Sequence, residues 1–121
     1  MVNLLNPELR TRDLRKLVEP NFYKVHWEIG VDETSEWVLA SLENEKYQAK
    51  LSSWLKSKKI DDNFEAICVD PSWSNLYFIK WQDLYEDLDV FFTNGNKFII
   101  SANRSWILEF SSEQIVRFGR W

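Results

Sequence analysis

The stretch DVFFTNGNKFIISANRSWILEF, residues 89–110, decides the fold of this chain. It predicts a three-stranded antiparallel meander. Asn94 and Gly95 form the dipeptide that a two-residue type I′ hairpin turn requires, because both central residues of that turn need positive φ. Apolar residues that favour strands lie on both sides of the turn. The turn sets the register and predicts two cross-strand pairs, Phe91 with Phe98 and Val90 with Ile99.

A second turn is expected at Asn103 and Arg104, although arginine resists positive φ. It would join the second strand of the meander to the third. The cross-strand pairs that it predicts are Ser101 with Trp106, Ile100 with Ile107, and Ile99 with Leu108.

Alternation along these strands divides their side chains between two sheet faces. One face holds Val90, Phe92, Ile99, Trp106, Leu108 and Phe110. The other holds Phe91, Phe98, Ile100 and Ile107. Because both faces are apolar, we expect each to be covered. Helices at about 34–59 and 75–88 would cover one, and a helix at about 7–18 or a second subunit the other.

Length and composition indicate one α+β domain over residues 1–121, with an antiparallel sheet that includes the meander. A chain of this length buries roughly two-thirds of its unfolded surface without metal or disulfide support. Seven tryptophans and an aromatic content of 16% supply large buried areas, so most of these rings are expected in the core.

The charge pattern favours a basic partner. The net charge is −4, which argues against a protein that binds nucleic acid through phosphate contacts. Residues 31–90 hold thirteen acidic and six basic side chains, so the acidity lies in the middle of the chain. Arg117, Arg120 and Trp121 near the end are too few to reverse this expectation.

One cysteine, Cys68, excludes an intramolecular disulfide, and its apolar surroundings at 66–69 predict a buried side chain. A reducing cytoplasm is therefore the expected compartment. No basic leader followed by an apolar run opens the sequence, and no apolar stretch approaches about 18 residues, so we expect neither secretion nor membrane spanning.

The N-terminal half alternates between helical and strand patterns. Asn6 and Pro7 predict a helix start, and Pro20 ends that helix near Val18. Residues 22–29 then predict a half-buried strand, with one side formed by Tyr23, Val25, Trp27 and Ile29.

The remaining elements are less uniform. Residues 34–59 predict one helix, or two helices with Asn44 capping the second, and 36–42 also fit a strand. Residues 64–69 predict a buried strand, and 75–88 a helix with Tyr77 and Trp81 on its apolar face. The tail at 111–121 fits either a helical turn or an edge strand.

The sequence predicts no catalytic residue, cofactor or metal. His26 is the single histidine and Cys68 the single cysteine, so no zinc site of the Cys/His type can be assembled. The three glycines form neither a nucleophile elbow nor a phosphate-binding loop. For His26 we expect a structural or surface role.

Carboxylates are the one abundant reactive group, and they are densest at Asp83, Glu86, Asp87 and Asp89. A solvated helix face is the commonest role of such a cluster. Docking of a basic partner is the first alternative, and Mg²⁺ binding or acid–base chemistry the second. Trp73, in a loop with Pro71, would either cap the core or anchor a partner.

The C-terminal half resembles bacterial immunity proteins of polymorphic or contact-dependent toxin systems. The resemblance is carried by the order of an acidic helix, the hairpin DVFFTNGNKFII and the strand WILEF in a small, acidic, aromatic-rich α+β chain. It implies a non-enzymatic protein that binds a cognate, basic protein toxin tightly and blocks it.

The resemblance implies an acidic patch that speeds encounter with the toxin and an aromatic anchor that slows release. The expected partner-binding residues are Glu43, Glu45, Trp73, Asp83, Glu86, Asp87 and Asp89. The alternative is a phage-type inhibitor, or an adaptor or scaffold subunit that acts through homo- or hetero-oligomerisation. A homodimer is left open, and a small enzyme with carboxylate chemistry is the third hypothesis.

Overall fold

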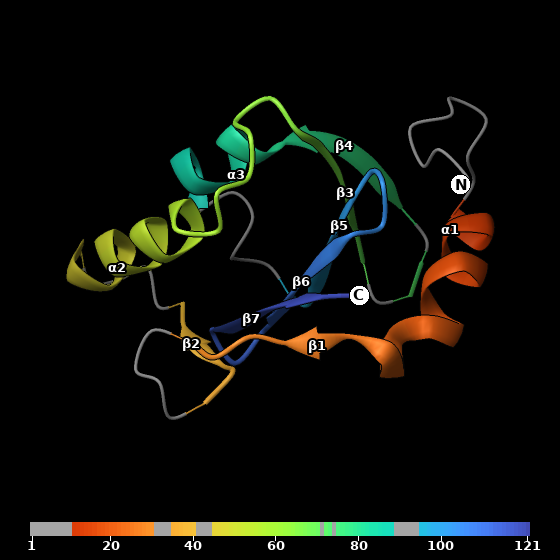
Figure 1. Cartoon of the computed structure of the whole chain (residues 1–121), viewed down its shortest axis with the longest axis horizontal. Coiled ribbons are helices and arrows are strands. Elements are labelled where there is room, and N and C mark those ends of the chain that lie inside the picture. Colours follow the sequence, from red (N-terminus) through yellow and green to blue (C-terminus); the bar gives the residue numbers. More distant parts are fainter. Residues whose placement is uncertain (1–10, 31–34, 41–44, 71, 74, 89–94) are drawn as a thin grey trace.

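Seven strands pair into one antiparallel sheet in the part of the chain that the structure describes (Figure 1). The structure is a computed structural model, and it describes residues 11–30, 35–40, 45–70, 72–73, 75–88 and 95–121. The strands are β1 (His26–Trp27), β2 (Val38–Leu39), β3 (Glu65–Val69), β4 (Leu76–Lys80), β5 (Lys97–Ser101), β6 (Trp106–Ser111) and β7 (Ile115–Arg120). The helices are α1 (Thr11–Val18), the 3₁₀ helix η1 (Glu19–Lys24), α2 (Glu45–Lys56) and α3 (Trp81–Glu86). The α+β class is as predicted.

The strand order is β1-β7-β6-β5-β3-β4, and β2 also pairs with β7. β3 lies inside the sheet between β4 and β5, and four of its five side chains are buried. The strand predicted at 64–69 is therefore confirmed. Its apolar run requires both faces to be covered, as is typical of an interior strand.

The second turn of the predicted meander is confirmed. Ile99 lies opposite Leu108 and Ile100 opposite Ile107. Arg104 does adopt positive φ, at 56°. The buried hydroxyl of Ser101 supports the turn, since it accepts hydrogen bonds from the backbone N–H groups of Ser105 (2.7 Å) and Trp106 (3.0 Å).

The first hairpin differs from the prediction. Residues 89–94, which include Val90, Phe91 and Asn94, lie outside the described residues. Both edges of β5 are occupied, because Phe98 lies opposite Val69 of β3 and opposite Glu109 of β6. The predicted pairs with Phe91 and Val90 are therefore wrong. The turn at Asn94 and Gly95 predicted that the segment before it would pair with β5. That position beside β5 is occupied by β3, which is distant in sequence. The C-terminal meander is formed by β5, β6 and β7.

Both sheet faces are covered, as expected from their apolar side chains. On one face Ile99, Trp106 and Leu108 pack with residues of α2 and α3, such as Leu55 and Leu84. Trp81 meets Trp106 edge to face there, with 5.0 Å between ring centroids.

The opposite face holds Ile100 and Ile107, which pack with Leu14 and Val18 of α1. Figure 1 shows α1 apart from α2 and α3, on the other side of the sheet. The helices thus cover the two faces as predicted. α1 covers the face for which a second subunit was the alternative.

The predicted helix at 75–88 is wrong in its first half. Residues 76–80 form β4, which pairs with β3 over its whole length. The run from Leu76 to Ile79 consists of strand-forming residues, and pairing with β3 outweighs the helical spacing of Tyr77 and Trp81. The helix begins only at Trp81, where Asp83 accepts a hydrogen bond from the Lys80 N–H.

In the segment 34–59 the strand alternative is confirmed, because β2 pairs Val38 with Val116. α2 then begins at Glu45, and Asn44 lies outside the described residues. The tail forms β7, so the strand alternative also holds there, although β7 is an interior strand and not an edge.

The predicted strand at 22–29 is reduced to the two residues of β1. Pro20 ends α1 at Val18 as expected, but the chain continues in the 3₁₀ helix η1, which has proline in its first turn. Tyr23 and Ile29 are consequently 79% and 65% exposed, and not on a buried strand face.

Candidate partner-binding surface

The segment 61–87 concentrates the acidity of the chain. It holds seven acidic residues and one basic residue, a net charge of −6, while the rest of the chain sums to +2. The segment runs from the turn before β3 through β4 to the end of α3. Its exposed acidic residues are Asp61, Asp62, Glu65, Asp83, Glu86 and Asp87.

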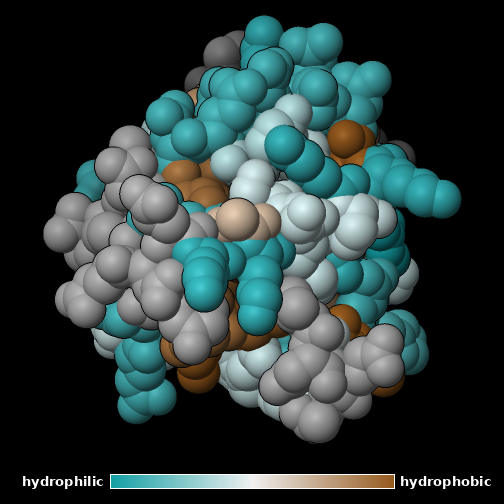
Figure 2. Space-filling view, turned by 90° about the vertical axis from the view of Figure 1, so that its left-hand side faces the viewer, coloured by the Kyte–Doolittle hydropathy of each residue, from teal (hydrophilic) through white to brown (hydrophobic). Residues whose placement is uncertain are grey.

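Three of the predicted site residues come together on and just after α3: Asp83, Glu86 and Asp87, all exposed. Glu43 and Asp89 lie outside the described residues. Glu45 is the first residue of α2, and its side chain is not among those described. Figure 2 faces the α2 end of the molecule, where hydrophilic residues predominate and hydrophobic areas are small and separate.

The carboxylates of α3 make local hydrogen bonds. Asp83 Oδ2 accepts from the Lys80 N–H at 3.0 Å, and this bond stabilises the helix start. Glu86 Oε1 accepts from Gln82 Nε2 at 2.9 Å, one helical turn away. Among the described residues, no three His, Cys, Asp or Glu side chains are placed to hold a metal ion. This arrangement suits attraction of a basic surface.

Asp62 joins the acidic cluster of α3 from a turn that is distant in sequence. Its carboxylate accepts a hydrogen bond from the Tyr85 hydroxyl at 2.7 Å. This hydrogen bond, together with the neighbouring negative charge, raises the pKa of Tyr85 to about 12. The sequence analysis missed this contact, because Asp62 and Tyr85 are 23 positions apart.

Trp73 caps the core from the β3–β4 loop. Its ring stacks on Phe98, with 5.8 Å between centroids and 20° between planes, and it packs on the side of the sheet that α1 covers. Its backbone has φ of 58°, and its N–H bonds to the Asp70 carbonyl at 3.0 Å. The side chain is half-buried, so part of it still faces solvent.

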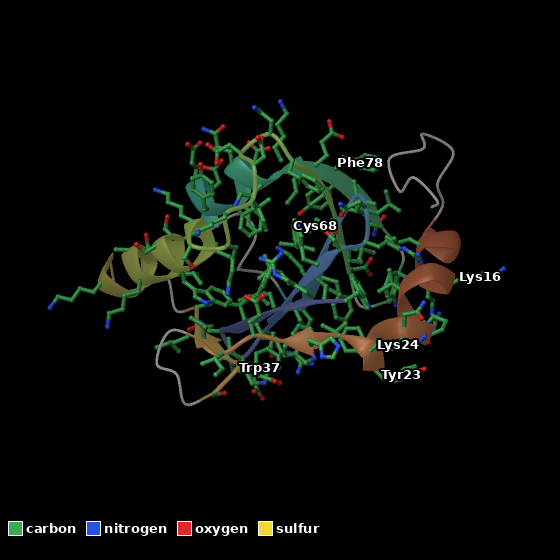
Figure 3. The ribbon with its side chains drawn as sticks, viewed as in Figure 1. Lys16, Tyr23, Lys24, Trp37, Cys68 and Phe78 are labelled. Atoms are coloured by element: carbon green, nitrogen blue, oxygen red, sulfur yellow. The ribbon has the colours of Figure 1, made fainter. Side chains whose placement is uncertain are left out.

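Two aromatic side chains of β4 were missed by the sequence analysis. Tyr77 and Phe78 are 46% and 45% exposed, and β4 is the last strand in the sheet order. Figure 3 shows Phe78 on β4, at the outer side of the sheet. The signal was present in the run of strand-forming residues from Leu76 to Ile79, but it was assigned to a helix.

On β7, next to the edge strand β1, the arginines are paired with carboxylates. Arg117 contacts Glu109 and Glu36, both at 2.6 Å, and Arg120 contacts Glu28 at 2.7 Å. These guanidinium groups serve the fold, and are therefore poorly placed to bind phosphate.

The single cysteine and the single histidine lie on β3 and β1, which are separated by three other strands in the sheet order. Cys68 is buried in β3, as predicted, and burial raises the pKa of its thiol. His26 is exposed on β1, which agrees with its expected surface role. A buried thiol and an isolated exposed imidazole do not form a nucleophile–base pair.

Searches for relatives found no family model, no curated protein and no solved structure that matches this chain. Within the described part of the chain, no helix has the length and apolar character needed to cross a membrane.

Proposed function

We propose that this chain is a non-enzymatic binding protein that neutralises a basic protein toxin by tight complex formation, the role of the immunity proteins that it resembles. The observation that carries the proposal is the charge of −6 on segment 61–87, with six of its carboxylates exposed. This charge is concentrated in one continuous stretch of the chain.

The physical basis is electrostatic steering. A surface with one sign of charge raises the rate at which an oppositely charged protein arrives, and it disfavours acidic partners. Steering alone does not hold a complex together, because exposed ion pairs contribute little net free energy. Retention then depends on aromatic side chains that become buried in the interface, and Tyr77 and Phe78 lie within the same segment.

The test is co-expression of the chain with the product of the neighbouring gene, followed by measurement of binding by calorimetry. We expect a dissociation constant below about 1 μM that weakens as salt is raised, because salt screens charge attraction. The double substitution Glu86→Lys with Asp87→Lys should weaken binding by at least tenfold. Glu113→Lys is the matched control, since Glu113 is an exposed glutamate in the β6–β7 turn, outside the acidic segment.

Two outcomes would contradict the proposal. Binding that is unaffected by salt and by the double substitution would remove its electrostatic basis. A homodimer that is insensitive to salt and takes no basic partner would favour the adaptor or scaffold alternative, for which the exposed Tyr77 and Phe78 of β4 would supply the contact.

A further inference from the structure

The outer edge of β4 presents backbone hydrogen-bonding groups at alternate residues. The Trp81 N–H bonds to the Phe64 carbonyl at 2.9 Å, so the backbone N–H of Trp81 points toward the chain that leads into β3. Because antiparallel pairs alternate, Ile79 and Tyr77 also direct their backbone groups toward β3, while Phe78 and Leu76 direct theirs outward. The Lys80 N–H agrees with this pattern, since it bonds to Asp83 and not to β3.

These outward groups find no partner among the described residues. No described strand lies beyond β4 in the sheet order, and no described hydrogen bond reaches the outward N–H or C=O of Leu76 or Phe78. Each residue therefore offers one donor and one acceptor, and the two sets are about 6.8 Å apart. An unpaired strand edge of this kind is a template for pairing with another extended chain.

The exposed side chains flank this edge on both faces of the sheet. Phe78 lies opposite Ile67, so it belongs to the face that α1 covers, and Tyr77 lies opposite Cys68 on the other face. An added strand points its side chains alternately to the two faces. Side chains at neighbouring positions of the added strand would thus meet one exposed aromatic ring on each face.

Acidic groups border both ends of the edge. Asp83 is bonded to Lys80 at one end, and Asp70 Oδ1 accepts from the Asn75 N–H at 2.9 Å at the other. Lys80 is the single basic residue of the segment 61–87. The edge is therefore complementary to an extended segment that carries positive charge.

We propose that β4 binds an extended basic segment of the partner as an added strand, paired through the backbone groups of Leu76 and Phe78. This inference rests on the proposed function and specifies how the basic partner is held. Charge argues against a second copy of this chain on the same edge. A symmetric antiparallel pair centred on Phe78 would bring Asp83 of each copy toward Asp70 of the other, and each copy has a net charge of −4.

The test uses the full chain and a synthetic peptide of about ten residues that alternates lysine and valine. Hydrogen exchange of backbone amides is followed by NMR with and without the peptide. The amides of Leu76 and Phe78 should exchange rapidly in the free protein and become protected at least tenfold when the peptide binds. Those of Tyr77 and Ile79 should be protected in both states, because they pair with β3.

Two control peptides separate the contribution of charge from that of backbone hydrogen bonds. A peptide with glutamate in place of lysine should not bind, since its charge matches that of the edge. A lysine peptide with alternate backbone nitrogens methylated should bind at least tenfold more weakly, because it lacks the required N–H donors.

A substitution tests the same bonds from the protein side. Phe78→Pro removes an outward N–H without removing a bond to β3, and Phe78→Val keeps that N–H while removing the ring. We expect the proline variant to bind the lysine peptide at least fivefold more weakly than the valine variant. Should Phe78→Pro fail to fold, the same comparison between Leu76→Pro and Leu76→Val replaces it.

Several results would overturn the inference. One is the absence of peptide binding up to about 1 mM. Another is binding that leaves the Leu76 and Phe78 amides unprotected. A third is concentration-dependent protection of these amides in the protein alone, which would show a second copy on the edge. If the partner from co-expression binds while the β4 amides stay unprotected, the binding function stands and strand addition fails. If no basic partner or peptide binds, both proposals fail.

Discussion

The guanidinium carbon of Arg117 lies 3.7 Å from the centroid of the Trp27 ring. The Trp37 ring is 4.6 Å from the same carbon, and Glu109 and Glu36 pair with the guanidinium nitrogens at 2.6 Å. This planar cation therefore joins three segments that are far apart in sequence: β1, the residues before β2, and β7. It holds β1 and the residues before β2 against β7, on the side of the sheet opposite to β4.

Arg117→Lys should lower the free energy of unfolding by about 1–2 kcal/mol, because a lysine ammonium keeps the charge but cannot stack on two indoles while it binds two carboxylates. Denaturant unfolding followed by tryptophan fluorescence measures the change. The control is Arg15→Lys, since the Arg15–Glu19 pair is exposed and should contribute nothing measurable. Equal stability of the Arg117→Lys variant and the unmodified protein would show that the stacking contributes nothing.

Ile99→Ala and Ile100→Ala should each cost about 2–4 kcal/mol, although the two residues are adjacent in β5. They point to opposite sheet faces, and both side chains are fully buried. In a sheet with one face in water, one of the two substitutions would be nearly neutral. Unfolding of the pair in denaturant thus tests whether both faces are covered, and a difference larger than about 2 kcal/mol would contradict it.

The sequence predicted what depends on local chemistry and periodicity. The pairs of Ile99 and Ile100 across the second turn, the two apolar faces and the interior strand β3 all follow from alternation and turn residues. The pairing of β3 with β5 could not be predicted, because their contact joins segments about thirty residues apart. β4 was mistaken for a helix because Tyr77, Trp81 and Leu84 also recur at helical spacing.

The candidate site was only partly predictable. The number of carboxylates and the cluster at Asp83, Glu86 and Asp87 can be read from the sequence. The approach of Asp62 to Tyr85 depends on how the turn before β3 meets α3. The open edge of β4 depends on which strand is last in the sheet, and no local pattern states that order.

Because of Glu28, the free energy of unfolding should depend on pH in the acid range. Burial would raise the pKa of this carboxyl, but hydrogen bonds from Lys58 and Arg120 outweigh burial and hold the pKa below the usual 4.5. Its contribution is therefore fully present above pH 4.5 and is lost as the pH falls through the lower folded-state pKa. Glu28→Gln should cost about 1–2 kcal/mol at pH 7, because it leaves Lys58 largely buried without its carboxylate.

The pH test compares thermal unfolding of Glu28→Gln and the unmodified protein between pH 7 and pH 3. The stability difference between them should shrink below pH 4.5, since protonation removes the same charge that the substitution removes. A difference that stays constant over this range would show that Glu28 does not titrate as described.

Gln114→Gly should stabilise the chain by about 0.5–1 kcal/mol. Gln114 has φ of 65° in the turn between β6 and β7, where its N–H bonds to the Ser111 carbonyl at 2.9 Å. Glycine adopts this conformation without the steric cost that other residues incur. Gln114→Val should destabilise by about 1 kcal/mol for the opposite reason. The two variants should thus change the unfolding midpoint in opposite directions, and changes of the same sign would refute the conformational argument.

Asp83→Ala should destabilise the chain by about 1 kcal/mol, whereas Asp87→Ala should leave its stability unchanged. Asp83 accepts the Lys80 N–H at the start of α3, and removal of such a helix-capping carboxylate typically has this cost. Asp87 has an exposed side chain at the end of the same helix, where a negative charge gives no benefit. Denaturant unfolding distinguishes the two variants, and equal stabilities would contradict the capping role. Because Asp83 stabilises the start of α3, charge reversal there would disturb the helix. Charge reversal at Glu86 and Asp87 disturbs α3 less and therefore tests partner binding more directly.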